Sequence, residues 1–285
     1  MTEGFTDRVV RAVASTGPLC AGIDPSSELL DHWGLDDTPD GLRTFGLSCV
    51  EAFAGVVPVV KPQVAFFERM GSAGLAVLEE VLGACRAAGL LAIADAKRGD
   101  IGSTMAAYAT AWLDPDSPLV ADAMTAVAYL GLGALRPAFD LAAAGGKGVI
   151  VVVRSSNPEG RALQEARTVA PDGAATGPAV EDLLLDDIAA CNRGGLAVAG
   201  TVGAVVGATR SPSAFDLSGL GGVILAPGVG AQGGTAEGTA ALFAGCAPGT
   251  VLPSVSRSLL VAGPDVAALR QAAATECAVL GSALG

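Results

Sequence analysis

The amino-acid sequence predicts an α/β protein that folds as a single (β/α)8 barrel, one domain over residues 1–285. Short β-rich runs alternate along the chain with stretches rich in Ala and Leu, the order expected of repeated strand and helix units around a parallel sheet. Eight such units fit a barrel, whose usual length is about 250 residues. No linker rich in Ser and Pro divides the chain, which also favours one domain.

Eight runs are predicted as the strands of this barrel. They are residues 19–24, 56–61, 90–95, 119–123, 149–153, 203–206, 222–226 and 251–255. The clearest helix between them is residues 72–88, where apolar residues recur at helical spacing before Gly89 ends the helix. The longest connection, residues 155–179, holds several prolines, glycines and charges, and such long loops are usually functional or mobile.

An open, doubly wound sheet is the alternative architecture. A dinucleotide-binding sheet of that kind carries Gly-x-Gly-x-x-Gly after its first strand. The first predicted strand ends instead in Gly22-Ile23-Asp24-Pro25-Ser26, which lacks that spacing. The barrel is therefore the favoured prediction.

Composition and charge exclude several classes of partner. The chain is 51% hydrophobic and 16% charged, so it can bury a large core. Its 17 basic and 29 acidic residues sum to −12, which repels phosphate backbones and anionic lipid, so we expect neither a nucleic acid polymer nor a membrane as partner. No uncharged stretch resembles a membrane-spanning helix of about 20 apolar residues. The N-terminus lacks the order of a secretory signal, and we expect a cytoplasmic protein.

Cysteine and histidine offer little for metal or redox chemistry. The six cysteines lie tens of residues apart without a Cys-x-x-Cys pair, and His32 is the single histidine. If the protein is an enzyme, its proton chemistry has to come from Lys, Asp, Glu or a hydroxyl group. The lysines are only three: Lys61, Lys97 and Lys147.

Charged residues end the first three predicted strands. Asp24, Lys61 and Asp95 each follow an apolar run, and the active site of a barrel lies at the carboxyl ends of its strands. The third strand continues into Asp-x-Lys-x-x-Asp, formed by Asp95, Lys97 and Asp100. Because strand side chains alternate, Asp95 and Lys97 should project from the same face, where the carboxylate keeps the lysine charged and able to donate a proton. A structural salt bridge is the simpler reading of that pair.

Two further stretches resemble an anion site. Glycines in residues 226–234 follow the seventh strand and allow backbone N–H groups to approach a phosphate closely. The eighth strand ends in Ser256 and Arg257, which could open a helix and place N–H dipoles and a guanidinium on that phosphate. Barrels often bind phosphate between these two loops.

Taken together, the motifs resemble those of orotidine 5′-phosphate decarboxylase, and in particular its actinobacterial-like branch (type 2). The likeness spans the whole chain. In order, its parts are Gly22-Ile23-Asp24-Pro25, Val60-Lys61-Pro62-Gln63, the motif from Asp95 to Asp100, Arg154-Ser155-Ser156-Asn157-Pro158, the glycine-rich run from Pro227 to Gly234, and Ser256-Arg257-Ser258.

The resemblance implies a carboxy-lyase that needs no cofactor and no metal. Such an enzyme decarboxylates orotidine 5′-monophosphate to uridine 5′-monophosphate, the last step of de novo pyrimidine synthesis. It implies that Lys97 protonates carbon 6 of the pyrimidine as carbon dioxide leaves, and that Asp95 lies close to the departing carboxylate. Asp100 would come from the neighbouring subunit of a homodimer. The implied catalytic residues are Lys97, Asp95, Asp100 and Lys61.

The resemblance also implies how the rest of the nucleotide is held. Asp24 and Lys61 would bind ribose hydroxyl groups, and Thr104 would reach the ribose from the partner chain. Ser156 would bind the pyrimidine. The implied substrate-binding residues are Asp24, Lys61, Thr104, Ser156, Asn157, Gly230, Gln232, Ser256 and Arg257. Arg43, Arg154 and Arg210 could also touch the ligand, and the sequence does not rank them.

Three other functions compete with this interpretation. A magnesium-dependent sugar-phosphate lyase of the same superfamily shares the Asp-x-Lys-x-x-Asp motif, but such relatives place a glutamate where this chain has Lys61, and a lysine repels a cation. A Schiff-base aldolase needs a neutral lysine, whereas acids flank Lys97 and keep it protonated. A barrel that only binds a phosphorylated ligand would lose no activity on replacement of Lys97.

Overall fold

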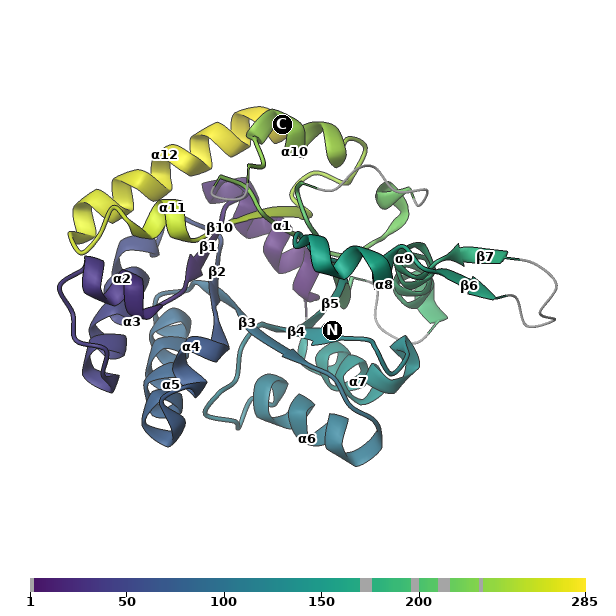
Figure 1. The fold of residues 1–285 in the computed structure, drawn as a ribbon, viewed down its shortest axis with the longest axis horizontal. Helices are drawn as coiled ribbons and strands as arrows, with labels where there is room; N and C mark the ends of the chain where they lie inside the picture. The colour runs from purple at the N-terminus through teal and green to yellow at the C-terminus, as the bar shows by residue number, and fades with distance from the viewer. Residues whose placement is uncertain (1–2, 170–175, 196–199, 210–215, 231–232) are drawn as a thin grey trace.

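The computed structural model describes residues 3–169, 176–195, 200–209, 216–230 and 233–285. Eight parallel strands form a closed barrel in the order β1-β10-β9-β8-β5-β4-β3-β2, so the (β/α)8 fold predicted from the sequence is confirmed (Figure 1). The barrel strands are β1 (Cys20–Ile23), β2 (Val59–Pro62), β3 (Leu91–Arg98), β4 (Ala123–Val127), β5 (Gly148–Arg154), β8 (Val202–Val206), β9 (Ile224–Pro227) and β10 (Val251–Val255).

Helices surround the barrel and connect its strands (Figure 1). The α-helices are α1 (Phe5–Thr16), α2 (Ser27–His32), α3 (Pro39–Phe53), α4 (Val64–Glu68), α5 (Gly71–Ala87), α6 (Gly102–Leu113), α7 (Arg136–Gly145), α8 (Arg161–Gln164), α9 (Val180–Ala190), α10 (Ala236–Leu242), α11 (Arg257–Leu260) and α12 (Val266–Leu284). Short helical turns are η1 (Leu132–Leu135), η2 (Pro158–Gly160), η3 (Cys191–Gly195) and η4 (Leu217–Gly219). Within the described ranges, no helix is both long and apolar enough to cross a membrane.

The fourth strand lies further along the chain than the sequence predicts. Residues 119–123 were expected to form it, but β4 is Ala123–Val127 and residues 119–122 lie outside any strand, with the Val120 N–H donating to the Ser117 carbonyl. Asp122 falls inside the predicted run and lies immediately before the observed strand. Its buried carboxylate accepts the Ala92 N–H at 2.9 Å and pairs with Arg8 where the strands begin.

The connection after β5 is more ordered than a plain loop. After η2 and α8, the chain forms a two-stranded antiparallel hairpin, β6 (Arg167–Val169) with β7 (Thr176–Ala179), which projects from the body of the protein (Figure 1). Both strands are short and have no regular apolar alternation, so the expected sequence signal of a strand is weak there.

Side chains of the barrel strands alternate between the interior of the barrel and the layer between the strands and the surrounding helices, and this alternation positions the site. Leu91 and Ile93 of β3 point into the barrel, whereas Ala92, Ala94 and Ala96 pack against the surrounding helices. Continuing the alternation directs Asp95 and Lys97 to the inside of the barrel at its carboxyl end.

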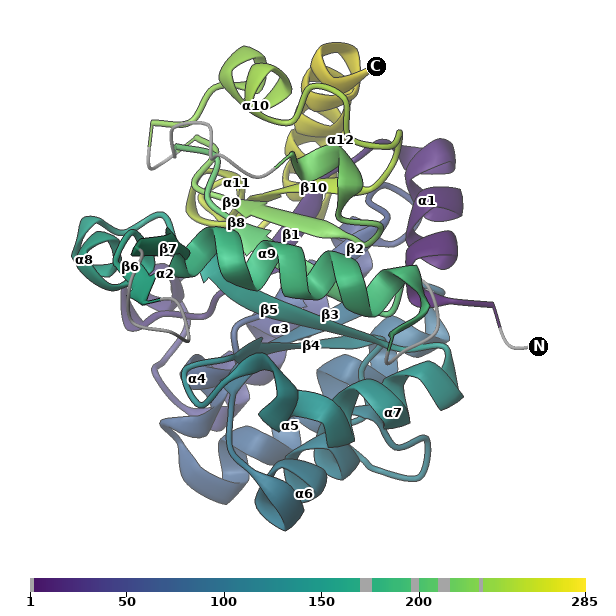
Figure 2. The same ribbon diagram turned by 90° about the vertical axis from the view of Figure 1, so that its right-hand side faces the viewer.

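Helix α1 closes the opposite end of the barrel from α2, α4 and α8 (Figure 2). Phe5 and Val9 are buried with the residues of the barrel interior. A Cβ atom on Gly148 would lie 2.4 Å from the Phe5 ring, so a glycine is needed there for the ring to fit. The Thr6 hydroxyl donates to the Gly200 carbonyl at 2.6 Å and fixes the start of the helix.

We expect Phe5→Ala to lower the free energy of unfolding by about 3 kcal/mol, because it removes a fully buried ring and leaves a cavity at the end of the barrel. Urea denaturation followed by circular dichroism measures the change. Val279→Ala on α12 is the control, since Val279 is 50% exposed. Equal midpoints for the two variants would contradict this role of α1.

Candidate active site

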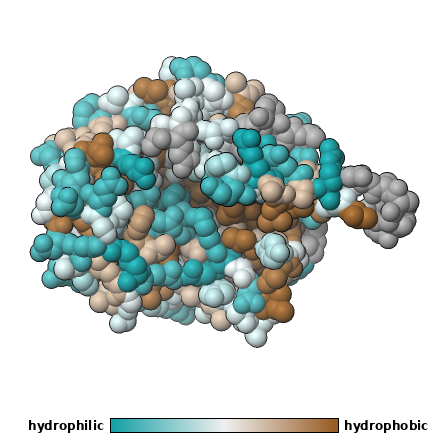
Figure 3. All heavy atoms as spheres, viewed as in Figure 1, coloured by the Kyte–Doolittle hydropathy of each residue, from teal (hydrophilic) through white to brown (hydrophobic). Residues whose placement is uncertain are grey.

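A cavity of about 380 Å³ opens at the carboxyl ends of the strands. Hydrophilic residues gather in the middle of this face of the molecule (Figure 3). The structure brings together eight of the residues singled out in the sequence. They are Asp24, Lys61, Asp95, Lys97, Ser156, Asn157, Ser256 and Arg257.

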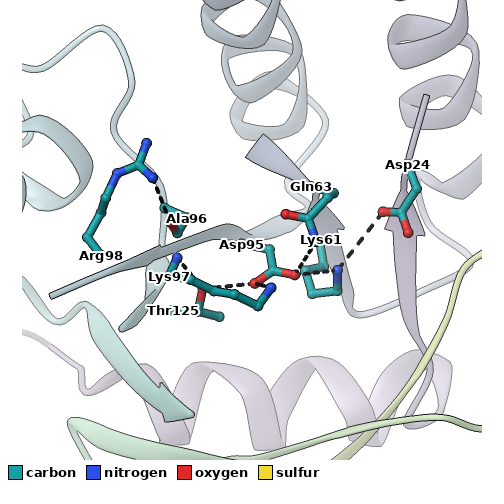
Figure 4. Close-up of polar contacts among 8 residues, drawn as sticks. All are labelled: Asp24, Lys61, Gln63, Asp95, Ala96, Lys97, Arg98 and Thr125. Carbon is teal, nitrogen blue, oxygen red and sulfur yellow. Dashed lines mark hydrogen bonds and ion pairs between the residues drawn. The ribbon is translucent and has the colours of Figure 1, made fainter. Parts of the chain in front are cut away.

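The carboxylate of Asp95 is the centre of the polar network in the cavity (Figure 4). Its Oδ2 accepts hydrogen bonds from Lys61 Nζ at 3.0 Å and Gln63 Nε2 at 2.8 Å. Its Oδ1 accepts from Lys97 Nζ at 2.6 Å and Thr125 Oγ1 at 2.9 Å. A carboxylate has about four lone-pair sites, so two cations and two neutral donors saturate it.

Burial and charge act in opposite directions on this network. Burial alone would raise the pKa of Asp95, but attraction by Lys61 and Lys97 outweighs it and holds that pKa well below its ordinary value. Burial alone would lower the pKa of Lys61, yet Asp95 and Asp24 together raise it above the ordinary lysine value. Asp95 and Lys61 are therefore a fixed negative and a fixed positive charge at neutral pH.

The two site lysines differ in access to the cavity. The side chain of Lys61 is only 8% exposed, whereas that of Lys97 is 48% exposed. Lys97 also has a φ of 47°, and it is the only residue other than glycine with a positive φ in the described part of the chain. This backbone conformation is strained for a residue with a Cβ atom, and strain of this kind is concentrated at functional sites.

Asp24 has a buried acceptor that no described residue satisfies. Its Oδ1 is buried and lies 4.0 Å from Lys61 Nζ, which is an ion-pair distance but too long for a hydrogen bond. No hydrogen-bond donor reaches this oxygen from any described residue. Because Asp24 lines the cavity, the oxygen can accept a hydrogen bond from a ligand hydroxyl group.

The predicted anion site lies on the part of the cavity wall that follows β9 and β10. Ser256 and Arg257 follow β10, and Arg257 begins α11 as the sequence suggests. Gly22 of β1 allows the close approach of Ser256, since a Cβ atom there would lie 1.8 Å from the serine Oγ. Gly228 and Val229 line the cavity beside them.

Gly230, Arg43 and Arg154 lie elsewhere. Gly230 does not line the cavity, and its N–H donates to the Gly234 carbonyl at 2.9 Å within its own loop. Gln232 lies outside the described residues, as does Arg210. Arg43 forms a surface ion pair with Glu80, and Arg154 is buried in an ion pair with Glu181 at 3.2 Å.

Asp100 and Thr104 lie outside the cavity of their own chain. The Asp100 carboxylate accepts the neighbouring Ile101 N–H at 2.8 Å, and Thr104 is exposed in the first turn of α6. Asp95 and Lys97 of the motif therefore line the cavity, whereas Asp100, its last carboxylate, does not.

Two residues of the Asp95 network were missed as site residues. Gln63 lies two positions after Lys61, so strand alternation could have found it. Thr125 could not be placed, because the fourth strand was predicted too early. Among the described residues, no group of three or more His, Cys, Asp or Glu side chains could hold a metal ion.

Comparison with known proteins adds relatives that match nearly the whole chain. Residues 17–272 match the profile of the orotidine 5′-phosphate decarboxylase / HUMPS family. Proteins named orotidine 5′-phosphate decarboxylase from Salinispora arenicola and Corynebacterium efficiens are 53% and 51% identical, each over 95% of both chains. A crystal structure from Streptomyces avermitilis, provisionally assigned the same name, superposes with a TM-score of 0.91 at 48% identity, covering 99% of this chain and 96% of the other.

Proposed function

This chain belongs to the orotidine 5′-phosphate decarboxylase / HUMPS family, and we propose that it is a carboxy-lyase that converts orotidine 5′-monophosphate into uridine 5′-monophosphate and carbon dioxide. This is the last step of de novo pyrimidine nucleotide synthesis. The observation that carries the proposal is the saturated Asp95 carboxylate, with two lysines on it and an open cavity beside it.

Lys97 is the proposed proton donor. As the bond between carbon 6 and the carboxylate carbon breaks, its electron pair stays on carbon 6 and carbon dioxide leaves. Lys97 Nζ then gives a proton to carbon 6, and solvent restores the ammonium group. A fixed ammonium stabilises the developing negative charge on carbon 6 more than it stabilises the substrate. The exposure of Lys97 to the cavity, in contrast to the burial of Lys61, supports this assignment.

Asp95 and Lys61 act in this proposal as fixed charges. Asp95 lies beside the departing carboxylate, and its saturated oxygens and low pKa make it a poor general base. It orients the Lys97 ammonium at 2.6 Å, while Lys61 balances its charge on the other oxygen. The reaction needs no cofactor, because the electron pair and the proton both move within this group.

The other parts of the nucleotide would contact the rest of the cavity wall. The unsatisfied oxygen of Asp24 suits a ribose hydroxyl, with Lys61 beside it. Ser156 is the proposed contact of the pyrimidine, and Asn157, which also lines the cavity, is a further proposed substrate contact. Arg257 supplies a guanidinium for the phosphate, next to Ser256. Gln232 is a further proposed phosphate ligand, and Gly230, which does not itself line the cavity, is proposed to act through the loop that leads to Gln232.

We propose in addition that the protein is a homodimer in which Asp100 and Thr104 complete the site of the partner. Both residues lie outside their own cavity, which supports this role. Exposed apolar side chains occur in the same region: Ile101 follows β3, and Tyr129 and Leu130 follow the neighbouring strand β4, with exposed fractions of 61%, 76% and 55%. A second copy of the chain would cover them.

Mixing two inactive variants tests the shared site. We expect Lys97→Ala and Asp100→Ala each to lose turnover, and a refolded equimolar mixture to regain about one quarter of wild-type activity, because half of the dimers are mixed and each has one intact site. Activity is measured per folded chain. A mixture as inactive as its components would show that Asp100 does not act on the partner site.

The activity itself is tested by following the absorbance of orotidine 5′-monophosphate without added metal and then with a chelator. We expect turnover in both conditions. Loss of activity on chelation would favour a magnesium-dependent lyase instead, and no turnover of this substrate would overturn the proposed function.

A further inference from the structure

We infer that Thr125 is a positioning residue for the proposed decarboxylation, because its hydroxyl group connects the backbone of Lys97 to the carboxylate of Asp95. The inference rests on the proposed function, since it assigns a role within that site. Thr125 does not line the cavity, so it acts on the substrate only through these two residues.

The hydroxyl group of Thr125 makes two hydrogen bonds of well-defined direction. Thr125 lies in the middle of β4 and is fully buried. Its Oγ1 accepts the Lys97 N–H at 2.9 Å and donates to Asp95 Oδ1 at 2.9 Å (Figure 4). A hydroxyl group has one donor and two acceptor sites, so the single proton is committed to the carboxylate.

The pairing of β3 with β4 explains why a side chain accepts this N–H. Ala94 lies opposite Met124 and Arg98 lies opposite Ala126, so the three residues 95–97 of β3 face Thr125 alone. The register shift makes a bulge, and a bulge disrupts the regular ladder of backbone hydrogen bonds. The Thr125 hydroxyl replaces the missing ladder acceptor for Lys97.

This hydrogen bond supports the strained backbone of Lys97. A φ of 47° persists in a lysine only where the surroundings hold it. The contacts form a closed ring: the Thr125 hydroxyl binds the Lys97 backbone and Asp95 Oδ1, and the Lys97 ammonium binds the same Oδ1 at 2.6 Å. Thr125 therefore restrains both ends of the proposed proton donor.

Valine at this position would keep the volume and the β-branched shape but remove both hydrogen bonds. The Lys97 N–H would lose its acceptor, and Asp95 would lose one of four donors. We expect Thr125→Val to lower kcat by about 10- to 100-fold, since an unmatched polar group costs roughly a factor of ten or more. We expect KM for orotidine 5′-monophosphate to change by less than about threefold, because the ribose and phosphate contacts remain.

The test compares Thr125→Val with Thr125→Ser, which retains the hydroxyl group and should recover most of the lost kcat. Thr250→Val is the matched control. Thr250 is also a buried threonine, but it lies just before β10 at the far end of the barrel, where its hydroxyl donates to the Ala247 carbonyl at 2.6 Å. We expect the control to keep the wild-type kcat.

A wild-type kcat in Thr125→Val would overturn the inference. An equal loss of kcat in the Val and Ser variants would also overturn it, because the hydroxyl group would then not matter. So would a loss expressed mainly in KM, because the effect would then lie in substrate binding. If Thr125→Val does not fold, Thr125→Ser and Thr125→Ala form the same comparison, since they differ by one hydroxyl group. Absence of turnover in the wild-type protein would instead overturn the proposed function, independently of Thr125.

Discussion

Lys97→Ala is expected to lower kcat by about 10⁴-fold or more, because it removes both the proposed proton donor and the ammonium that stabilises negative charge on carbon 6. Calorimetric titration with uridine 5′-monophosphate should show that binding remains within about tenfold of the wild-type affinity, since other residues hold the ribose and phosphate. The loss should therefore be confined to the chemical step.

Lys147→Ala is the matched control for that lysine. Lys147 Nζ lies 3.6 Å from Asp122 Oδ1, near α1 at the far end of the barrel. Its removal should leave kcat unchanged, even if stability falls slightly. A Lys97→Ala protein that turns over substrate within tenfold of the wild type would contradict the role of Lys97 as proton donor.

Asp95→Asn is expected to lower kcat by roughly 10³-fold, because a preorganised charged group in a site contributes on that order. Asparagine has one carbonyl oxygen and an amide that donates, so it cannot accept the four hydrogen bonds of the carboxylate. Two lysines would then lose their shared counter-charge. Steady-state kinetics on protein that circular dichroism shows to be folded measures the effect.

Asp122→Asn separates this catalytic loss from the cost of breaking a buried ion pair. Asp122 and Asp95 have equally buried side chains, 8% exposed in each case, and each pairs with two cations. Both variants should lose stability, on the order of 3 kcal/mol. Only Asp95→Asn should lose kcat, and equal kcat losses in the two variants would argue against a site role.

The lowered pKa of Asp95 also predicts how the stability of the protein depends on pH. The pKa of Asp95 is lowered in the folded chain, so the stability that its charge contributes is complete above its unfolded pKa of about 3.9 and is lost as the pH falls. The difference in unfolding free energy between wild type and Asp95→Asn should therefore be constant near neutrality and shrink below about pH 4. Denaturation at several pH values measures it, and a constant difference down to pH 2 would contradict the lowered pKa.

Much of the barrel and part of the site could be predicted because they depend on local pattern. Seven of the eight predicted strands overlap most of an observed strand, since each is an apolar run bounded by turn residues. The fourth was placed too early, because residues 119–121 are apolar like the start of a strand, whereas the observed strand begins at Ala123. The hairpin formed by β6 and β7 was missed because its strands are short and have no clear alternation.

The sequence by itself determined the (β/α)8 fold and the position of Asp24, Lys61, Asp95 and Lys97 at one rim, because strand order and a period of two residues are local properties. The tertiary structure alone decided the four donors on Asp95, the bulge in β3 and the positive φ of Lys97 within it, and the place of Thr125 between Asp95 and Lys97. These depend on the register between neighbouring strands. Packing and hydrogen bonding between residues such as Asp95 and Thr125, which are 30 positions apart, set that register. No local pattern in the sequence predicts it.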